Sequence, residues 1–212
     1  MTRQTNTINQ DWLVTSDGQC QPRPSSREWD LIRDRYYLHQ FLSEIVDMLN
    51  SVSDPADEWD YLPQIRMRVR QLITNSYWVR SQFADPDPKT GVAILTLYDE
   101  IGYPLTVQTV ITNPGVCSPI HNHGTWGVIA VLQGREEHTF WRCTGDLDSP
   151  DRIELVGLKT LCPTEIISFV PDAIHRVKAI GNEPVVAFHL YGDTQPRSRF
   201  EFNPATHTAK PF

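Results

Sequence analysis

The chain has 212 residues, of which 40% are hydrophobic, and its formal net charge at pH 7 is -7. This length suffices for one domain with a full core, and nothing indicates a second catalytic domain. An acidic balance without any run of lysine or arginine disfavours a nucleic acid or an anionic membrane as partner. We therefore expect a small-molecule partner, and the composition predicts no particular oligomeric state.

Residues 1–10 lack the apolar core of a signal peptide, and no segment approaches the length needed to cross a bilayer, which predicts a cytoplasmic protein. The four cysteines form no CxxC pair, so we interpret them as free thiols in a reducing cytosol. Cys117 lies four residues before His121, and it is either a buried structural residue, a metal ligand or a redox-sensitive thiol.

Residues 1–24 are polar and contain two late prolines, a composition typical of an irregular N-terminal arm. Residues 25–90 show helical periodicity, and we expect a helical segment packed on a sheet. Capping-box spacing at Ser25 and Glu28 indicates one helix, and Asp54-Pro55, an N-cap followed by proline, indicates a second. The apolar residues at three- and four-residue spacing are Leu38, Phe41, Leu42, Ile45, Val46, Leu49, Leu62, Ile65, Val69, Leu72 and Ile73.

From residue 91 the hydrophobic period changes to two, and short apolar runs alternate with turn residues. About eight strands with short connections predict a mainly β fold, a jelly-roll barrel over residues 91–212 that includes a C-terminal tail. We expect arm, helices and barrel to form one structural domain. The predicted strands are residues 92–98, 105–111, 126–132, 136–141, 153–161, 165–169, 176–180 and 185–191.

Three histidines in two of these segments are the strongest chemical signal. His121 and His123 are separated by one residue, and on a strand this spacing points both side chains to the same face. His175 supplies a third imidazole from another segment. Three nitrogen ligands leave positions open for substrate and for dioxygen or water, whereas a structural site is closed by four ligands. The pattern predicts a catalytic metal site.

The strand predicted over residues 185–191 adds polar groups to this site. Alternation along it places Ala187, His189 and Tyr191 on one face and apolar residues on the other. A neutral His189 can share a hydrogen bond with the Tyr191 phenol, which in turn can donate to substrate or to a bound oxygen species. The alternative is that His189 is a satisfied histidine in a barrel core.

Together these motifs resemble a known superfamily. Residues 115–134, which contain His121-Asn122-His123, resemble the first cupin motif, and residues 171–177 resemble the second. The glutamate that many cupins carry after the paired histidines is replaced by Gly127. A three-histidine site without a carboxylate is similar to that of the thiol dioxygenases of the cysteine dioxygenase type I family, and His189-Leu190-Tyr191 matches the His-x-Tyr pair of that family. The resemblance covers about residues 90–200.

The resemblance implies a cupin double-stranded β-helix with N-terminal α-helices and an Fe(2+) cofactor bound by three ligands, His121, His123 and His175. It also implies that Tyr191, oriented by His189, is a catalytic hydrogen-bond donor. The implied function is that of a non-haem iron(II) thiol dioxygenase. Such an enzyme converts a small thiol, such as cysteine or 3-mercaptopropionate, to its sulfinate with dioxygen.

Three positions depart from the family pattern. Ala187 replaces the serine that precedes the histidine of the His-x-Tyr pair, which removes one hydroxyl from the hydrogen-bond relay. Val128 stands where animal-type enzymes carry a cysteine crosslinked to the tyrosine, so no such crosslink is expected. The arginine that pairs with the cysteine carboxylate would fall near Leu95, where the sequence has none. The identity of the thiol therefore stays open.

The mercaptopropionate-type branch of the family offers another carboxylate anchor. This branch resembles the chain at Trp126-Gly127 and places an arginine shortly after the tyrosine, where Arg197 stands. Arg197 is thus a candidate for substrate binding, with an exposed surface arginine as the alternative. His138 lies on a predicted strand and either lines the pocket or packs in the core, and Arg176 is expected to point away from the metal.

Two other classes of function remain open. One is a different metal-dependent cupin enzyme, such as an isomerase or a carbon–carbon dioxygenase. The other is a non-catalytic cupin that binds a small molecule, although binding alone requires no open metal site.

Overall fold

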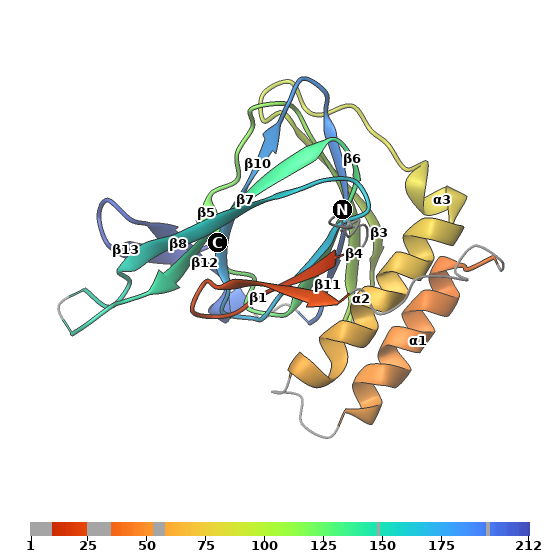
Figure 1. The fold of residues 1–212 in the computed structure, drawn as a ribbon, viewed down its shortest axis with the longest axis horizontal. Helices are drawn as coiled ribbons and strands as arrows, with labels where there is room; N and C mark the ends of the chain where they lie inside the picture. Colours follow the sequence, from red (N-terminus) through yellow and green to blue (C-terminus); the bar gives the residue numbers. More distant parts are fainter. Residues whose placement is uncertain (1–9, 25–34, 53–57, 148, 194–195) are drawn as a thin grey trace, which may run out of the picture.

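The structure, a computed structural model, describes residues 10–24, 35–52, 58–147, 149–193 and 196–212. Two β-sheets face each other, and a helical layer covers the outer surface of one of them (Figure 1). The first sheet contains, in spatial order, β2 (Cys20–Pro24), β1 (Gln10–Val14), β9 (Ile166–Phe169), β6 (Gly127–Gln133), β11 (Val185–Tyr191), β4 (Thr106–Thr112) and β3 (Val92–Asp99).

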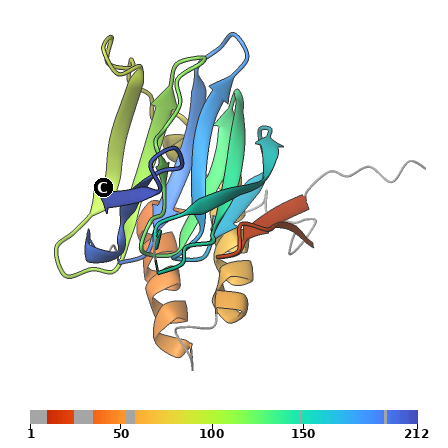
Figure 2. The same cartoon turned by 90° about the vertical axis from the view of Figure 1, so that its left-hand side faces the viewer.

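The second sheet closes the other side of the barrel, as the turned view in Figure 2 also shows. Its strands are, in spatial order, β13 (Thr208–Pro211), β12 (Phe200–Asn203), β5 (Ile120–His121), β10 (Ile174–Ile180), β7 (Arg135–Cys143) and β8 (Ile153–Leu161).

The order of the central strands defines a jelly roll. The strands from β4 to β11 divide into β4-β11-β6-β9 in one sheet and β5-β10-β7-β8 in the other. In this arrangement the first strand pairs with the last, and each later pairing lies closer to the middle of the sequence, as in a double-stranded β-helix. The predicted fold class is therefore confirmed, and all eight predicted strands are present with ends that differ by two residues or fewer.

The helical layer consists of α1 (Leu38–Ser51), α2 (Glu58–Asn75) and the short α3 (Tyr77–Arg80). Helix α1 begins after Tyr37, whose side chain makes no capping bond. The predicted caps at Ser25, Glu28 and Asp54-Pro55 lie outside the described residues. The apolar stripes of both helices pack against the first sheet, where Phe41, Ile45, Ile65 and Val69 are fully buried.

The central strands of the first sheet are buried on both faces, and alternation along them separates two cores. Phe188 and Leu190 of β11 belong to the core under the helices, whereas Ala187 belongs to the core inside the barrel. Strand β6 divides in the same way, with Val128 facing the helices and Ile129 facing the barrel interior. This division directs His189 and Tyr191 into the barrel.

Residues 10–24 correct one expectation. They form the β1–β2 hairpin instead of an irregular arm, and β1 continues the first sheet by parallel pairing with β9. The partner strand follows more than 150 residues later, so no local pattern could reveal the pairing. The C-terminal tail is also ordered, because β12 pairs with β5 and with β13.

A buried ionic cluster holds the hairpin to α2. Asp11 of β1 is 1% exposed and accepts contacts from Arg66, at 3.5 Å, and from Arg70. Arg66 also donates to Ser168 Oγ at 2.8 Å, and Arg70 donates to the Thr164 carbonyl at 2.9 Å. The cluster therefore links the hairpin, the helical layer and the strand β9 that follows Thr164.

No helix among the described residues is long and apolar enough to span a membrane.

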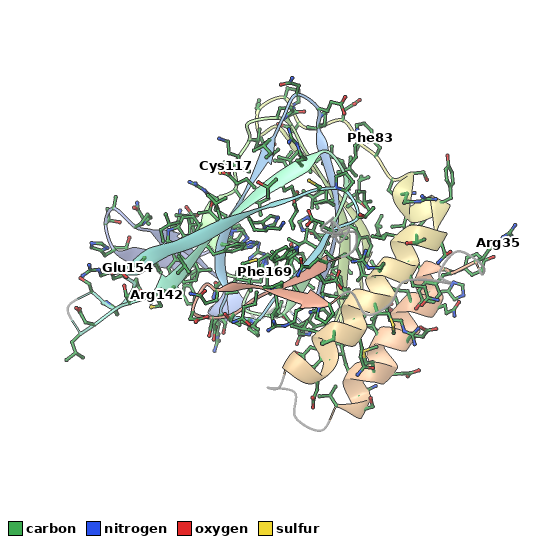
Figure 3. All side chains as sticks on the ribbon, in the orientation of Figure 1. Arg35, Phe83, Cys117, Arg142, Glu154 and Phe169 are labelled. Carbon is green, nitrogen blue, oxygen red and sulfur yellow. The ribbon has the colours of Figure 1, made fainter. Side chains whose placement is uncertain are left out.

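Replacing Asp11 by alanine should destabilise the fold strongly, because two buried guanidinium groups would lose the one carboxylate that they contact among the described residues. We expect a loss of about 3–5 kcal/mol in the free energy of unfolding, measured by urea denaturation. Glu154→Ala is the matched control, since its pair with Arg142 lies exposed at the far end of the β7–β8 hairpin (Figure 3) and should contribute less than about 1 kcal/mol. Equal losses in the two variants would contradict this role.

Candidate metal centre

The three predicted ligands come together in the barrel interior. His121 ends β5 and lies directly opposite His175 of β10 in the antiparallel register. His123 follows after the strand has ended, so only one of the paired histidines lies on a strand, which corrects that part of the prediction. The ligand nitrogens of all three nevertheless lie within 4.8 Å of one another. The cluster is one that could bind a metal ion.

All three imidazoles are suited to bind a cation as neutral ligands. They are 7%, 5% and 1% exposed for His121, His123 and His175. Burial lowers the pKa of His121 to about 4, and burial with neighbouring rings places the pKa values of His123 and His175 well below the ordinary value. Each ring therefore keeps a lone pair at neutral pH, which a metal ligand requires.

The geometry of the nitrogens agrees with this chemistry. The Nε2 atoms of His123 and His175 are 2.8 Å apart. Two adjacent ligands of an octahedral ion, each about 2.1 Å from it, would be roughly 3 Å apart. The Nδ1–H of His121 donates to the Pro119 carbonyl at 3.0 Å, and this bond leaves Nε2 as the lone-pair nitrogen. The donor set fits a divalent transition metal with open coordination positions.

His189 and Tyr191 lie beside this cluster. His189 Nδ1 is 2.7 Å from the Tyr191 hydroxyl, and the Tyr191 and His123 ring centroids are 4.7 Å apart. Burial lowers the pKa of His189 to about 4 and raises that of Tyr191, so both groups are neutral at pH 7. The alternation predicted from the sequence therefore places these two side chains as expected.

The protonation pattern of the pair follows from burial. His189 Nε2 is buried without a hydrogen-bond partner among the described residues, and Ala187 offers none. Burying an unpaired acceptor lone pair at Nε2 costs less free energy than burying an unpaired N–H donor there. We therefore assign the ring proton to Nδ1. Nδ1–H then donates to the tyrosine oxygen, and the phenolic hydrogen is free to donate to a ligand. The missing serine hydroxyl thus leaves the pair itself intact.

Gly127 lies opposite Tyr191 in the pairing of β6 with β11. A Cβ atom at position 127 would lie 3.1 and 3.2 Å from two carbons of the Tyr191 ring. This contact is tighter than side chains normally tolerate. The ring therefore occupies the space next to the position where many cupins carry a glutamate, and the glycine allows its close approach.

The site opens into a cavity of about 360 Å³ that the three histidines, His189 and Tyr191 all line. Phe169 packs against the ring of His175, with centroids 4.2 Å apart, and Figure 3 shows it in the barrel interior. Among the described residues, the charged side chains that line the cavity are Glu136 and Arg199. The cavity is largely apolar with a few convergent polar groups, as small-molecule sites are.

The predicted anchor Arg197 lies elsewhere. Arg197 is exposed in the short 3₁₀ helix Pro196–Ser198 and lines a different cavity with Asn122 and Asp172. Arg199, two residues later, lines the histidine cavity, and its guanidinium lies 3.9 Å from the centre of the Phe212 ring. The structure therefore brings Arg199, and not Arg197, to the histidine cavity.

The structure also places the other residues that the sequence offered as candidates for the site. His138 is fully buried, bonds Glu136 at 3.0 Å and does not line the cavity, although its ring stacks near His175. Arg176 stacks over Trp141 at 5.5 Å, away from the histidines as expected. Cys117 is exposed and lines the cavity, so the expectation of a buried structural cysteine is wrong. Glu136 was missed, although alternation along its strand places it on the face of His138.

No family model matches the sequence. Solved structures with a similar fold include a cupin-2 domain protein from Rhodospirillum rubrum (14% identity, TM-score 0.39, covering 50% of this chain and 62% of that one). They also include an oxalate oxidase in complex with glycolate (17%, 0.42, 58% and 61%) and the cupin domain of Cnp3 from Schizosaccharomyces pombe (15%, 0.39, 49% and 61%).

This chain therefore spans about three fifths of the length of each of these three proteins. Two of the three are described as cupin domains, and the likeness is distant. The strand order of the barrel identifies its fold as a jelly roll.

Replacing His175 by alanine should remove metal binding, because the two remaining nitrogens cannot hold an ion against water. We expect the purified protein to lose at least about tenfold in metal content by elemental analysis. His39→Ala is the matched control, since His39 is exposed on α1 and should leave the metal content unchanged. Full metal content in the His175 variant would contradict the assignment.

Proposed function

We propose that the protein is a non-haem iron(II) thiol dioxygenase that oxidises a small thiol to its sulfinate. The observation that carries the proposal is the Tyr191 hydroxyl, which is oriented by His189 at 2.7 Å and lies beside three neutral imidazoles in one cavity. Such a site offers open metal positions together with a hydrogen-bond donor held ready for a ligand.

The proposed reaction balances without a further reductant. A thiol and dioxygen give a sulfinate and one proton, both oxygen atoms end on sulfur, and the four electrons that sulfur loses are those that dioxygen gains. A bound ferrous ion would supply the redox chemistry that lets dioxygen react with a thiolate. The three histidines would hold that ion and leave its positive charge uncompensated, which favours the thiolate form of the substrate.

The remaining side chains bind and orient the substrate. Tyr191 donates its hydroxyl hydrogen into the cavity, and His189 prevents the phenol from rotating away. Arg199, instead of the candidate Arg197, has the role of carboxylate anchor in this proposal. Its guanidinium lines the cavity and can bind a substrate carboxylate in bidentate fashion. Stacking on Phe212 holds the guanidinium plane, so less conformational freedom is lost on binding.

The proposal is tested by oxygen consumption of the iron-loaded protein with cysteine, 3-mercaptopropionate, cysteamine and mercaptosuccinate. Uptake of one dioxygen per thiol and a sulfinate identified by mass spectrometry are expected with at least one of them. The metal-free protein is the control. Oxygen uptake with none of the thiols, or disulfide as the sole product, would reject the proposal.

The Tyr191→Phe variant should keep its iron and lose activity. Removing the hydroxyl takes away a hydrogen bond in the reacting complex, which corresponds to roughly a tenfold to hundredfold lower kcat. Iron content by elemental analysis and kcat by oxygen electrode give the two readouts. An unchanged kcat would show that the tyrosine takes no part in the reaction.

Arg199→Gln should raise the KM for 3-mercaptopropionate by about tenfold or more, because a charge-assisted bond to the carboxylate is lost. The KM for cysteamine, which carries no carboxylate, should change little. Arg197→Gln is the matched control, since Arg197 lies outside the cavity and should behave as the unaltered protein. If the Arg197 substitution raises the KM and the Arg199 substitution does not, Arg197 is the residue that binds the carboxylate.

A further inference from the structure

A buried carboxylate lines the cavity and is not used by the proposed chemistry. Glu136 of β7 is 3% exposed, and its Oε2 is 3.0 Å from His138 Nε2. Among the described residues no other side chain bonds this carboxylate, and its Oε1 is not among the buried polar atoms that lack a partner. Oε1 is therefore open to the cavity, and it is free to bind a ligand.

His138 is the one side chain among the described residues that bonds this carboxylate, through its Nε2–H. A buried carboxylate with a single donor is costly and is stabilised by a cation nearby. None of the described arginine or lysine side chains forms an ion pair with it.

Glu136 lies well beyond the metal centre along the barrel. In the pairing of β7 with β10, His175 is opposite Phe140, whereas Glu136 is opposite Ala179. The two backbone levels differ by four residues, but the side chains lie closer than that, because the His138 ring that bonds Glu136 at 3.0 Å stacks on His175 with centroids 5.8 Å apart. Arg199 lies near the other end of the cavity, just before β12, which pairs with His121. The carboxylate and the guanidinium are thus on opposite sides of the histidines.

The wall between the histidines and Glu136 is apolar. It is formed by Val177 and Ala179 of β10, by Ile129 of β6 and by Val110 of β4, all of which line the cavity. A ligand that reaches from the histidines to Glu136 needs an apolar middle.

We propose that Glu136 binds a positively charged nitrogen at the far end of the substrate. The substrate of this cavity is then an extended amino thiol. This inference rests on the proposed function only for the position of the sulfur. The sulfur would sit at the histidines, a short chain of methylene groups would contact Val177 and Ala179, and the ammonium would donate to Oε1. A longer chain of methylene groups buries more of this apolar wall than a short one does.

Binding to zinc-loaded protein tests this without any oxidation. Calorimetry would compare chain-matched pairs of an amino thiol and a hydroxy thiol: cysteamine with 2-mercaptoethanol, and 4-aminobutane-1-thiol with 4-mercaptobutan-1-ol. We expect the longer amine to bind at least about tenfold more tightly than its alcohol, with a smaller difference for the shorter pair. Equal affinities within the longer pair would overturn the proposal.

Two substitutions assign the preference to Glu136. Glu136→Gln should abolish the preference for the amine while zinc content stays unchanged, and Glu137→Gln, on the opposite face of the same strand, should preserve it. Glu136→Asp keeps the charge but withdraws it by one methylene group, so it should shift the best amine to a longer chain. An amine preference that survives in Glu136→Gln, or loss of zinc from that variant, would overturn the role.

The outcomes separate this inference from the proposed function. If the iron-loaded protein oxidises no thiol but the zinc-loaded protein prefers the long amine, the proposed function fails and the Glu136 subsite stands. If short thiols are oxidised and no amine preference exists, the proposed function stands and the subsite fails.

Discussion

Strand β11 is buried on both faces, and the site depends on which of its side chains face the barrel. Phe188 and Leu190 pack under the helices, and each contributes about 1.5–3 kcal/mol through its burial. A shift of one residue would put these two into the cavity and turn His189 and Tyr191 toward the helices. The apolar packing of α1 and α2 therefore fixes the register that the polar pair needs, and the helical layer supports the site without touching its ligands.

Hydrophobic periodicity within single segments predicted the helices and most strands of the barrel. The eight predicted strands each show their own period of two, and the helical stripes show theirs. The β1–β2 hairpin was missed because its sheet pairing joins Asp11 to Ile166, across most of the chain, and because Asp11 is buried only with two distant arginines. Strand β5 has two residues, too few for any period, and it exists because β10 and β12 lie on either side of it.

The site was predictable where spacing along one element decides the outcome. The His-x-Tyr pair follows from alternation, and the same rule applied to β7 would have placed Glu136 beside His138. Arg197 and Arg199 could not be distinguished in this way, because they lie in a turn where one is exposed and the other reaches the cavity. Which arginine enters is determined by the pairing of β12 with β5, a contact between distant segments.

The fit of Gly127 against Tyr191 has a consequence for how such sites diverge. A Cβ atom at position 127 would lie 3.1 and 3.2 Å from two carbons of the tyrosine ring, so the ring must give way by a few tenths of an ångström before a carboxylate can enter from that position. Gaining a carboxylate ligand there is therefore coupled to the placement of Tyr191, and a substitution of Gly127 acts on the hydrogen-bond donor as well as on the ligand set.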